Sequence, residues 1–164
     1  RFLLTGAAGF IAQRLLPVLL TKGYEANAAY VMLQGLTMQS KVPGLSVVET
    51  DFLKSGTLQN IPGDIDAVYY LIHSMSTSKG NFERLKEISA ASFRDHIQET
   101  SARQVIYLSG IVNEESLSRH LSSRRNVVRM LDAGNYSLTT IRAGIIIGSG
   151  GASFLTSLKN YPWW

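Results

Sequence analysis

The sequence predicts an α/β fold, in which a doubly wound parallel sheet of about six strands carries helices on both faces. Two observations lead to this fold class. Short apolar runs alternate with longer helical patterns, and several runs, such as "AVYYLI" and "QVIYLS", are almost continuously apolar, as in strands that are covered on both faces. Crossovers between parallel strands are right-handed, and for this kind of doubly wound sheet we expect the strand order 3-2-1-4-5-6.

Six segments have the composition of strands. Each is short, rich in apolar or β-branched residues, and separated from the next by polar or glycine-containing stretches. They are residues 1–5, 25–32, 45–50, 67–72, 104–109 and 138–142.

Three segments between them have helical periodicity, namely 9–21, 82–99 and 114–133. Gly23 and Gly134 follow the first and the third, where glycine commonly ends a helix. Pro17 lies inside the first helix, where it removes a hydrogen bond and favours a kink. Residues 34–44 are weakly patterned, and we expect a short helix or a loop there.

The composition excludes several classes of protein. The 164 residues are 45% hydrophobic and 17% charged, which is typical of one globular domain. There is no cysteine, no cluster with metal-ligand spacing and no run of 18 apolar residues, so we expect no disulfide, no bound metal and no membrane span. A net charge of +4 is too small to indicate a nucleic-acid partner. We expect a cytoplasmic protein.

The turn "TGAAGFIA" follows the first strand and opens the first helix. Gly6 permits a tight turn, and Gly9 permits a close approach of the backbone to a pyrophosphate. The helix then offers N–H groups and a positive dipole end to an anion. Ala12 permits close packing of helix on strand. In a repeating βαβ context, this pattern predicts a site for a dinucleotide cofactor.

The spacing of this turn resembles that of the short-chain dehydrogenase/reductase superfamily, a group of NAD(P)-binding Rossmann proteins, and in particular its extended and atypical, NmrA-like or sugar-epimerase-like branches. The segments "DF", "AVYYLIHSM", "VIYLSGI" and "TTIRAGIIIGSGGASF" resemble the third to sixth strands of these proteins and the stretches that follow them. The resemblance implies contacts with the cofactor from residues after the first, third and fourth strands. These are Gly6, Ala8, Gly9, Phe10, Ile11, Asp51, Phe52, Leu71, Ile72, His73 and Ser74.

The cofactor is NAD or NADP, and the positive net charge favours NADP slightly. No acidic residue or arginine follows the second strand between Ala26 and Gln34, where one would select between the two nucleotides. Arg14 is the nearest candidate for a 2′-phosphate contact, with a solvated helix position as the alternative.

The superfamily uses a Tyr-x-x-x-Lys pair for proton transfer, and none of the seven tyrosines has a lysine four residues later in this sequence. The segment "HLSSR" keeps the spacing, with His120 in place of the tyrosine and Arg124 in place of the lysine. Ser109 ends the fifth strand, where the resemblance implies a serine that polarises the substrate oxygen. We therefore take Ser109, His120 and Arg124 as the candidate catalytic residues, with ordinary surface or strand-end positions as the alternative.

Two functional hypotheses follow. The chain is an NAD(P)-binding oxidoreductase-like or epimerase-like protein with a non-standard active site, acting on an unknown small molecule; alternatively, it is a non-catalytic NAD(P)-sensing regulatory module, as NmrA-like proteins are believed to be. We expect residues 1–164 to form one cofactor-binding domain whose C-terminal, substrate-binding part is incomplete. The ending "PWW" indicates either a longer chain or a hydrophobic docking surface, so a protein partner or a homo-oligomer stays open.

Overall fold

The computed structural model describes residues 1–31, 42–72, 82–111, 119–144, 146 and 148. Its centre is a six-stranded sheet in the order β3-β2-β1-β4-β5-β6, with every neighbouring pair parallel, which confirms the predicted fold class and strand order. The strands are β1 (Phe2–Leu4), β2 (Ala26–Tyr30), β3 (Leu45–Glu49), β4 (Ala67–Tyr70), β5 (Gln104–Gly110) and β6 (Ser137–Ala143).

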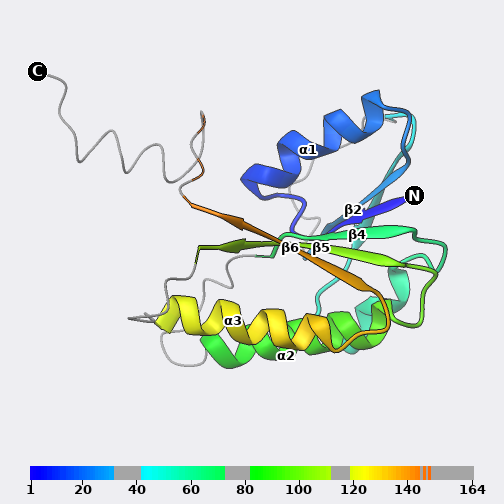
Figure 1. Ribbon diagram of the computed structural model, residues 1–164. Helices are drawn as coiled ribbons and strands as arrows, with labels where there is room; N and C mark the ends of the chain where they lie inside the picture. Colours follow the sequence, from blue (N-terminus) through cyan, green and yellow to red (C-terminus); the bar gives the residue numbers. More distant parts are fainter. Residues whose placement is uncertain (32–41, 73–81, 112–118, 145, 147, 149–164) are drawn as a thin grey trace, which may run out of the picture.

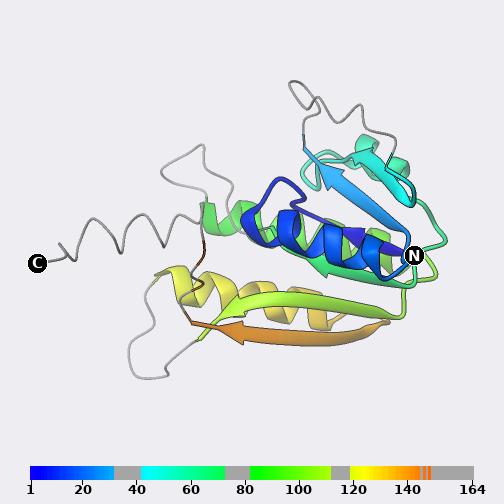
Figure 2. The same cartoon turned by 90° about the horizontal axis from the view of Figure 1, so that it is seen from above.

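In the described residues, three α-helices cover the sheet, and they lie within the ranges predicted for them. The helix α1 (Phe10–Thr21) lies on one face, whereas α2 (Phe82–Ile97) and α3 (Arg119–Asp132) lie side by side on the other (Figures 1 and 2). The helix α1 continues through Pro17 without interruption. Residues 34–41 and the first part of the range predicted for α3, residues 114–118, lie outside the described residues.

One element was not predicted. A 3₁₀-helix, η1 (Ser55–Asn60), follows β3 in a segment where the sequence shows no helical periodicity. Local hydrogen bonds account for it, because the Thr57 hydroxyl accepts from the Asp51 N–H at 2.8 Å and donates to the Lys54 carbonyl at 2.9 Å. Side-chain to backbone bonds of this kind favour turns and are invisible to a periodicity argument.

The alternation of side chains along the strands divides the core into two layers. Leu3 packs into the layer beneath α2 and α3, and its neighbour Leu4 packs into the layer beneath α1. On α2, Phe93 and Ile97 are fully buried, as their helical spacing predicted. Burial on both faces explains why the inner strands β1, β2 and β4 are apolar without alternation, whereas the edge strands β3 and β6 are more exposed.

The strand order places a switch point beside β1. The chain proceeds from β1 to β2 on one side, and the later strands are added through β4 on the other. In sheets of this type, ligands bind outside the carboxyl ends of the strands at the switch point. The glycine-rich turn follows β1 and therefore lies at this position.

Candidate functional site

The turn between β1 and α1 requires glycine at its first position for two independent reasons. Gly6 has φ of +65°, which L-residues with a side chain rarely adopt. A Cβ atom at this position would also lie 2.9 Å from the carbonyl oxygen of Leu71 and 3.1 Å from its carbonyl carbon. The chain after β1 therefore passes directly over the end of β4.

Thr5 joins these two segments, and the sequence reasoning missed its role. Its backbone N–H donates to the Tyr69 carbonyl at 3.0 Å, and its hydroxyl donates to the same carbonyl at 3.3 Å. The hydroxyl also accepts the N–H of Leu71 at 3.1 Å. Thr5 is fully buried, so these bonds are shielded from water. The threonine in "TGAAG" was the available signal, because a buried hydroxyl at a strand end needs partners.

The first turn of α1 carries N–H groups without a backbone acceptor in the described part of the chain. Gly9 is the N-cap residue, with an extended backbone and no side-chain cap, and the first turn has no acidic residue. Within the described residues, the N–H groups of Phe10, Ile11 and Ala12 have no backbone acceptor. A helix N-terminus with free donors and no nearby carboxylate is suited to an anion such as a phosphate group.

Further contacts hold this turn in shape. The Gly9 N–H donates to the Gly6 carbonyl at 2.8 Å, and a Cβ on Gly9 would lie 3.0 Å from that oxygen. Ala8 is exposed, and its carbonyl accepts from the Gln13 side-chain amide at 3.0 Å. Ala12 is buried against the sheet, as predicted for the third small position. The backbone of the turn is thus accessible yet firmly positioned.

Phe10 links the turn to the segment after β6. The Arg14 guanidinium carbon lies 3.6 Å from the centre of the Phe10 ring, and an Arg14 nitrogen donates to the Phe10 carbonyl at 3.2 Å. A Cβ added to Gly148 would lie 2.7 Å from the tip of the same ring. Gly148 therefore comes close to the first residue of α1 although it is remote in sequence.

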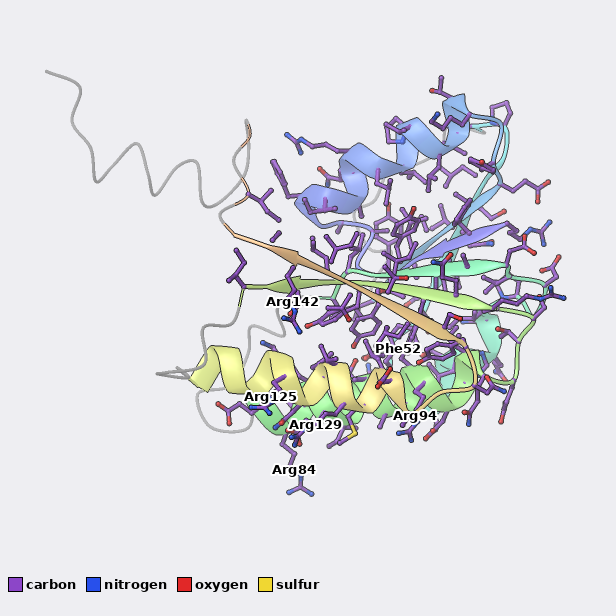
Figure 3. All side chains as sticks on the ribbon, viewed as in Figure 1. Phe52, Arg84, Arg94, Arg125, Arg129 and Arg142 are labelled. Atoms are coloured by element: carbon purple, nitrogen blue, oxygen red, sulfur yellow. The ribbon has the colours of Figure 1, made fainter. Side chains whose placement is uncertain are left out.

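Asp51 and Phe52 follow β3, at the same edge of the sheet. One Asp51 carboxylate oxygen accepts the Leu53 N–H at 3.0 Å, and the other lies 3.7 Å from the Lys54 ammonium nitrogen. The Phe52 side chain is buried between the sheet and α2, where its ring packs edge-on against that of Phe93 with ring centres 5.4 Å apart. Figure 3 shows Phe52 on this side of the sheet. Only the backbone of Phe52 is thus left to face a ligand.

The end of β4 contributes Leu71 and Ile72. Leu71 is buried against the layer beneath α1, and Ile72 packs against the other layer. Their backbone lies beside Gly6, since an added Cβ there would meet Leu71 and approach the Ile72 nitrogen to 3.4 Å. The structure thus brings together the predicted cofactor-binding segments that follow β1 and β4. His73 and Ser74 lie outside the described residues.

The candidate catalytic residues occupy β5 and α3. Ser109 is buried near the end of β5. His120 and Arg124 lie in the first turns of α3, and their side chains are outside the described part of the structure. The end of β5 and the start of α3 lie at the same end of the molecule (Figure 2).

The tyrosines of the central strands have a different role. Burial raises the pKa of Tyr70 far above its usual value, and its ring packs 4.6 Å from that of Phe93 and 5.8 Å from that of Tyr107. A phenol that keeps its proton throughout the neutral range is a poor general base. Tyr70 is therefore part of the core and does not replace the tyrosine of the superfamily pair.

A metal site and a membrane span are two further possibilities for the described residues. No group of three or more histidine, aspartate or glutamate side chains there is arranged to hold a metal ion. No helix in that part of the chain is both long and apolar enough to cross a membrane.

Solved structures from several organisms share this fold. The Bordetella bronchiseptica enzyme WbmG in complex with NAD and UDP superposes with a TM-score of 0.68 and 15% identity, over 87% of this chain and 52% of its own. A nucleoside-diphosphate-sugar epimerase from Staphylococcus aureus gives 0.71 and 12%, over 87% and 50%. The triphenylmethane reductase of Citrobacter sp. complexed with NADP(H) gives 0.72 and 15%, over 86% and 48%. The chain thus spans about half the length of these proteins.

The sequence comparisons give the family. A search of curated proteins finds no match to this chain. The model of the NAD dependent epimerase/dehydratase family, in contrast, matches residues 2–109, from the first strand through the fifth. The match includes the glycine-rich turn, Asp51 and Ser109. The chain belongs to the NAD dependent epimerase/dehydratase family.

Proposed function

We propose that this chain binds a nicotinamide dinucleotide across the carboxyl edge of its sheet. The observation that carries the proposal is the start of α1, where three consecutive N–H groups lack backbone acceptors among the described residues, directly after a turn that only glycine fits. Such a site suits the pyrophosphate of the cofactor. The family membership and the NAD and NADP(H) complexes of structural neighbours support the proposal.

The remaining contacts follow from the same edge of the sheet. Asp51 and the backbone of Phe52, which follow the end of β3, would meet the adenine. Leu71 and Ile72, followed by His73 and Ser74, would run along the ribose and nicotinamide. We keep NADP as the slightly favoured form because of the net charge of +4, although Arg14 is already engaged with Phe10.

We further propose that the chemistry is that of an oxidoreductase or an epimerase. The bound nicotinamide would accept or donate a hydride. Ser109 would donate a hydrogen bond to the substrate oxygen, His120 would transfer a proton near neutral pH, and Arg124 would hold a ribose or phosphate oxygen. The chain spans about half the length of its structural neighbours, and we propose a small molecule as its substrate.

A second candidate function is favoured by one specific observation. The 164 residues contain no Tyr-x-x-x-Lys pair, so the proton-transfer machinery usual for the superfamily is missing from this sequence. A cofactor-binding protein without that machinery can act as a sensor that changes its partners when the dinucleotide binds. The two functions share the cofactor site and differ only in turnover.

The test is a titration of the purified protein with NADH and with NADPH, followed by assays for carbonyl reduction and sugar-nucleotide epimerisation. We expect saturable binding in the wild type and its loss in Gly6→Ala, with Gly63→Ala as a control because nothing lies within 4 Å of a Cβ added to Gly63. Absence of binding to either nucleotide would overturn both candidate functions. Turnover that falls in Ser109→Ala and His120→Ala supports the enzyme, whereas binding without turnover supports the sensor.

A further inference from the structure

The strand register places an arginine beside the candidate catalytic serine. Arg142 on β6 is the Cα partner of Ser109 on β5, in a parallel ladder that runs from Gln104 and Ser137 to Gly110 and Ala143. Neighbouring strands lie about 4.8 Å apart, so the two residues are adjacent across the sheet. Arg142 lies outside residues 2–109, which match the family, and belongs to none of the motifs of the sequence.

Alternation along the strands puts both side chains on the same face. On β5, Val105 and Tyr107 pack into the layer beneath α2 and α3, and Ser109 continues that alternation. On β6, Leu138 packs against the same layer, and Arg142 lies four residues further on and so on the same side. Figure 3 shows Arg142 on the side of the sheet that α2 and α3 cover.

The charge of Arg142 is uncompensated by the described part of the protein. Its side chain is exposed, and no ion pair joins it to a carboxylate there. Arg125, exposed in the first half of α3, adds a second positive charge at this end of the molecule (Figure 3).

We propose that Arg142 and Ser109 form an anion subsite, which holds a carboxylate or phosphoryl group of the substrate next to its reacting carbon. The inference rests on the proposed function, because it places the anion beside the serine that would contact the substrate. A guanidinium presents two parallel N–H groups to a carboxylate or phosphate, which fixes orientation as well as adding attraction. The positive charge of Arg125 would add to the attraction of anionic substrates to this edge. The substrate class is therefore an anionic small molecule.

The test uses nuclear magnetic resonance on the full chain, with NADH present in saturating amount so that the glycine-rich turn is occupied. Inorganic phosphate and acetate are titrated separately, and the backbone amide signals of Ser109 and Gly110 report the affinity. We expect phosphate or acetate to bind at least about tenfold more weakly to Arg142→Gln, as for the loss of a charged hydrogen-bond pair. Arg142→Lys, which keeps the charge and loses the paired donors, should fall between. The anion that binds more tightly identifies the phosphoryl or the carboxylate class.

Arg129→Gln is the matched control, because Arg129 is an exposed arginine on the same side of the sheet but lies in the last turn of α3. Its affinity for either anion should equal that of the wild type. Equal affinities in wild type and Arg142→Gln, or an equal loss in Arg129→Gln, would overturn the subsite. Failure of NADH to bind would overturn the proposed function and not the subsite. In that case the anion titration is carried out in the absence of NADH, and its result still tests the role of Arg142.

Discussion

Replacing Gly6 with alanine tests how the turn is built. The change forces an L-residue to φ of +65° and puts a Cβ 2.9 Å from the Leu71 carbonyl oxygen. The left-handed conformation costs about 1–2 kcal/mol. The contact costs about 1–3 kcal/mol more, because the obstacle is backbone and cannot rotate away. We expect a loss of about 2–5 kcal/mol from a total stability of about 5–15 kcal/mol.

The structure offers a control that separates the two costs. Gly23 has φ of +78°, and nothing lies within 4 Å of a Cβ added there. Gly23→Ala should therefore cost only the conformational part, about 1–2 kcal/mol. Urea denaturation followed by circular dichroism gives both values. If Gly6→Ala loses no more stability than Gly23→Ala, the close approach of the turn to β4 is refuted.

Three further predictions concern residues around the same sheet. Thr5→Val should lower the free energy of unfolding, measured by urea denaturation, by about 1–3 kcal/mol, because the Leu71 N–H is left buried without its acceptor. Thr5→Ser keeps the hydroxyl and should lower it much less. Equal losses in the two variants would contradict the hydrogen bond. Gly148→Ala should weaken NADH binding in fluorescence titration by displacing the Phe10 ring, and Phe10→Leu in the same protein should restore it; no change in the single variant would refute the contact. Burial raises the pKa of Tyr136 to about 12, above its value in the unfolded chain, so the stability linked to its proton is complete below about pH 10 and is lost as the pH rises through 12. Tyr136→Phe should flatten that alkaline loss in thermal melts, and an unchanged pH profile would argue against it.

Much of the fold was predictable from local signals. All six strands and the three helices follow from runs of apolar residues and from their spacing, because burial on both faces of a parallel sheet leaves a strong mark on composition. The strand order was expected from the doubly wound fold class, and the sheet has that order. The helix η1 was missed because its cause is a pair of hydroxyl bonds from Thr57, which have no periodicity.

The candidate site was predictable in part. Gly6 and Gly9 stand out in the sequence, since a glycine-rich turn between strand and helix has a known physical use. The hydrogen bonds of the Thr5 side chain were not predictable, because their partners, Tyr69 and Leu71 at the end of β4, lie more than sixty residues away in the sequence. The buried position of Phe52 was likewise beyond the sequence, because "DF" does not tell which face of the sheet the ring joins.

The sequence alone determined the fold class and the presence of a glycine-rich turn, because these depend on residue type at short spacing; the order of the strands was expected from the fold class. Only the tertiary structure decided why Gly6 must be glycine and which residues adjoin Ser109. The Leu71 backbone contacts the turn at Gly6, and Arg142 lies next to Ser109, because parallel strands bring residues into register across long separations in the chain. Such neighbours are set by the pairing of strands, and no local pattern records them.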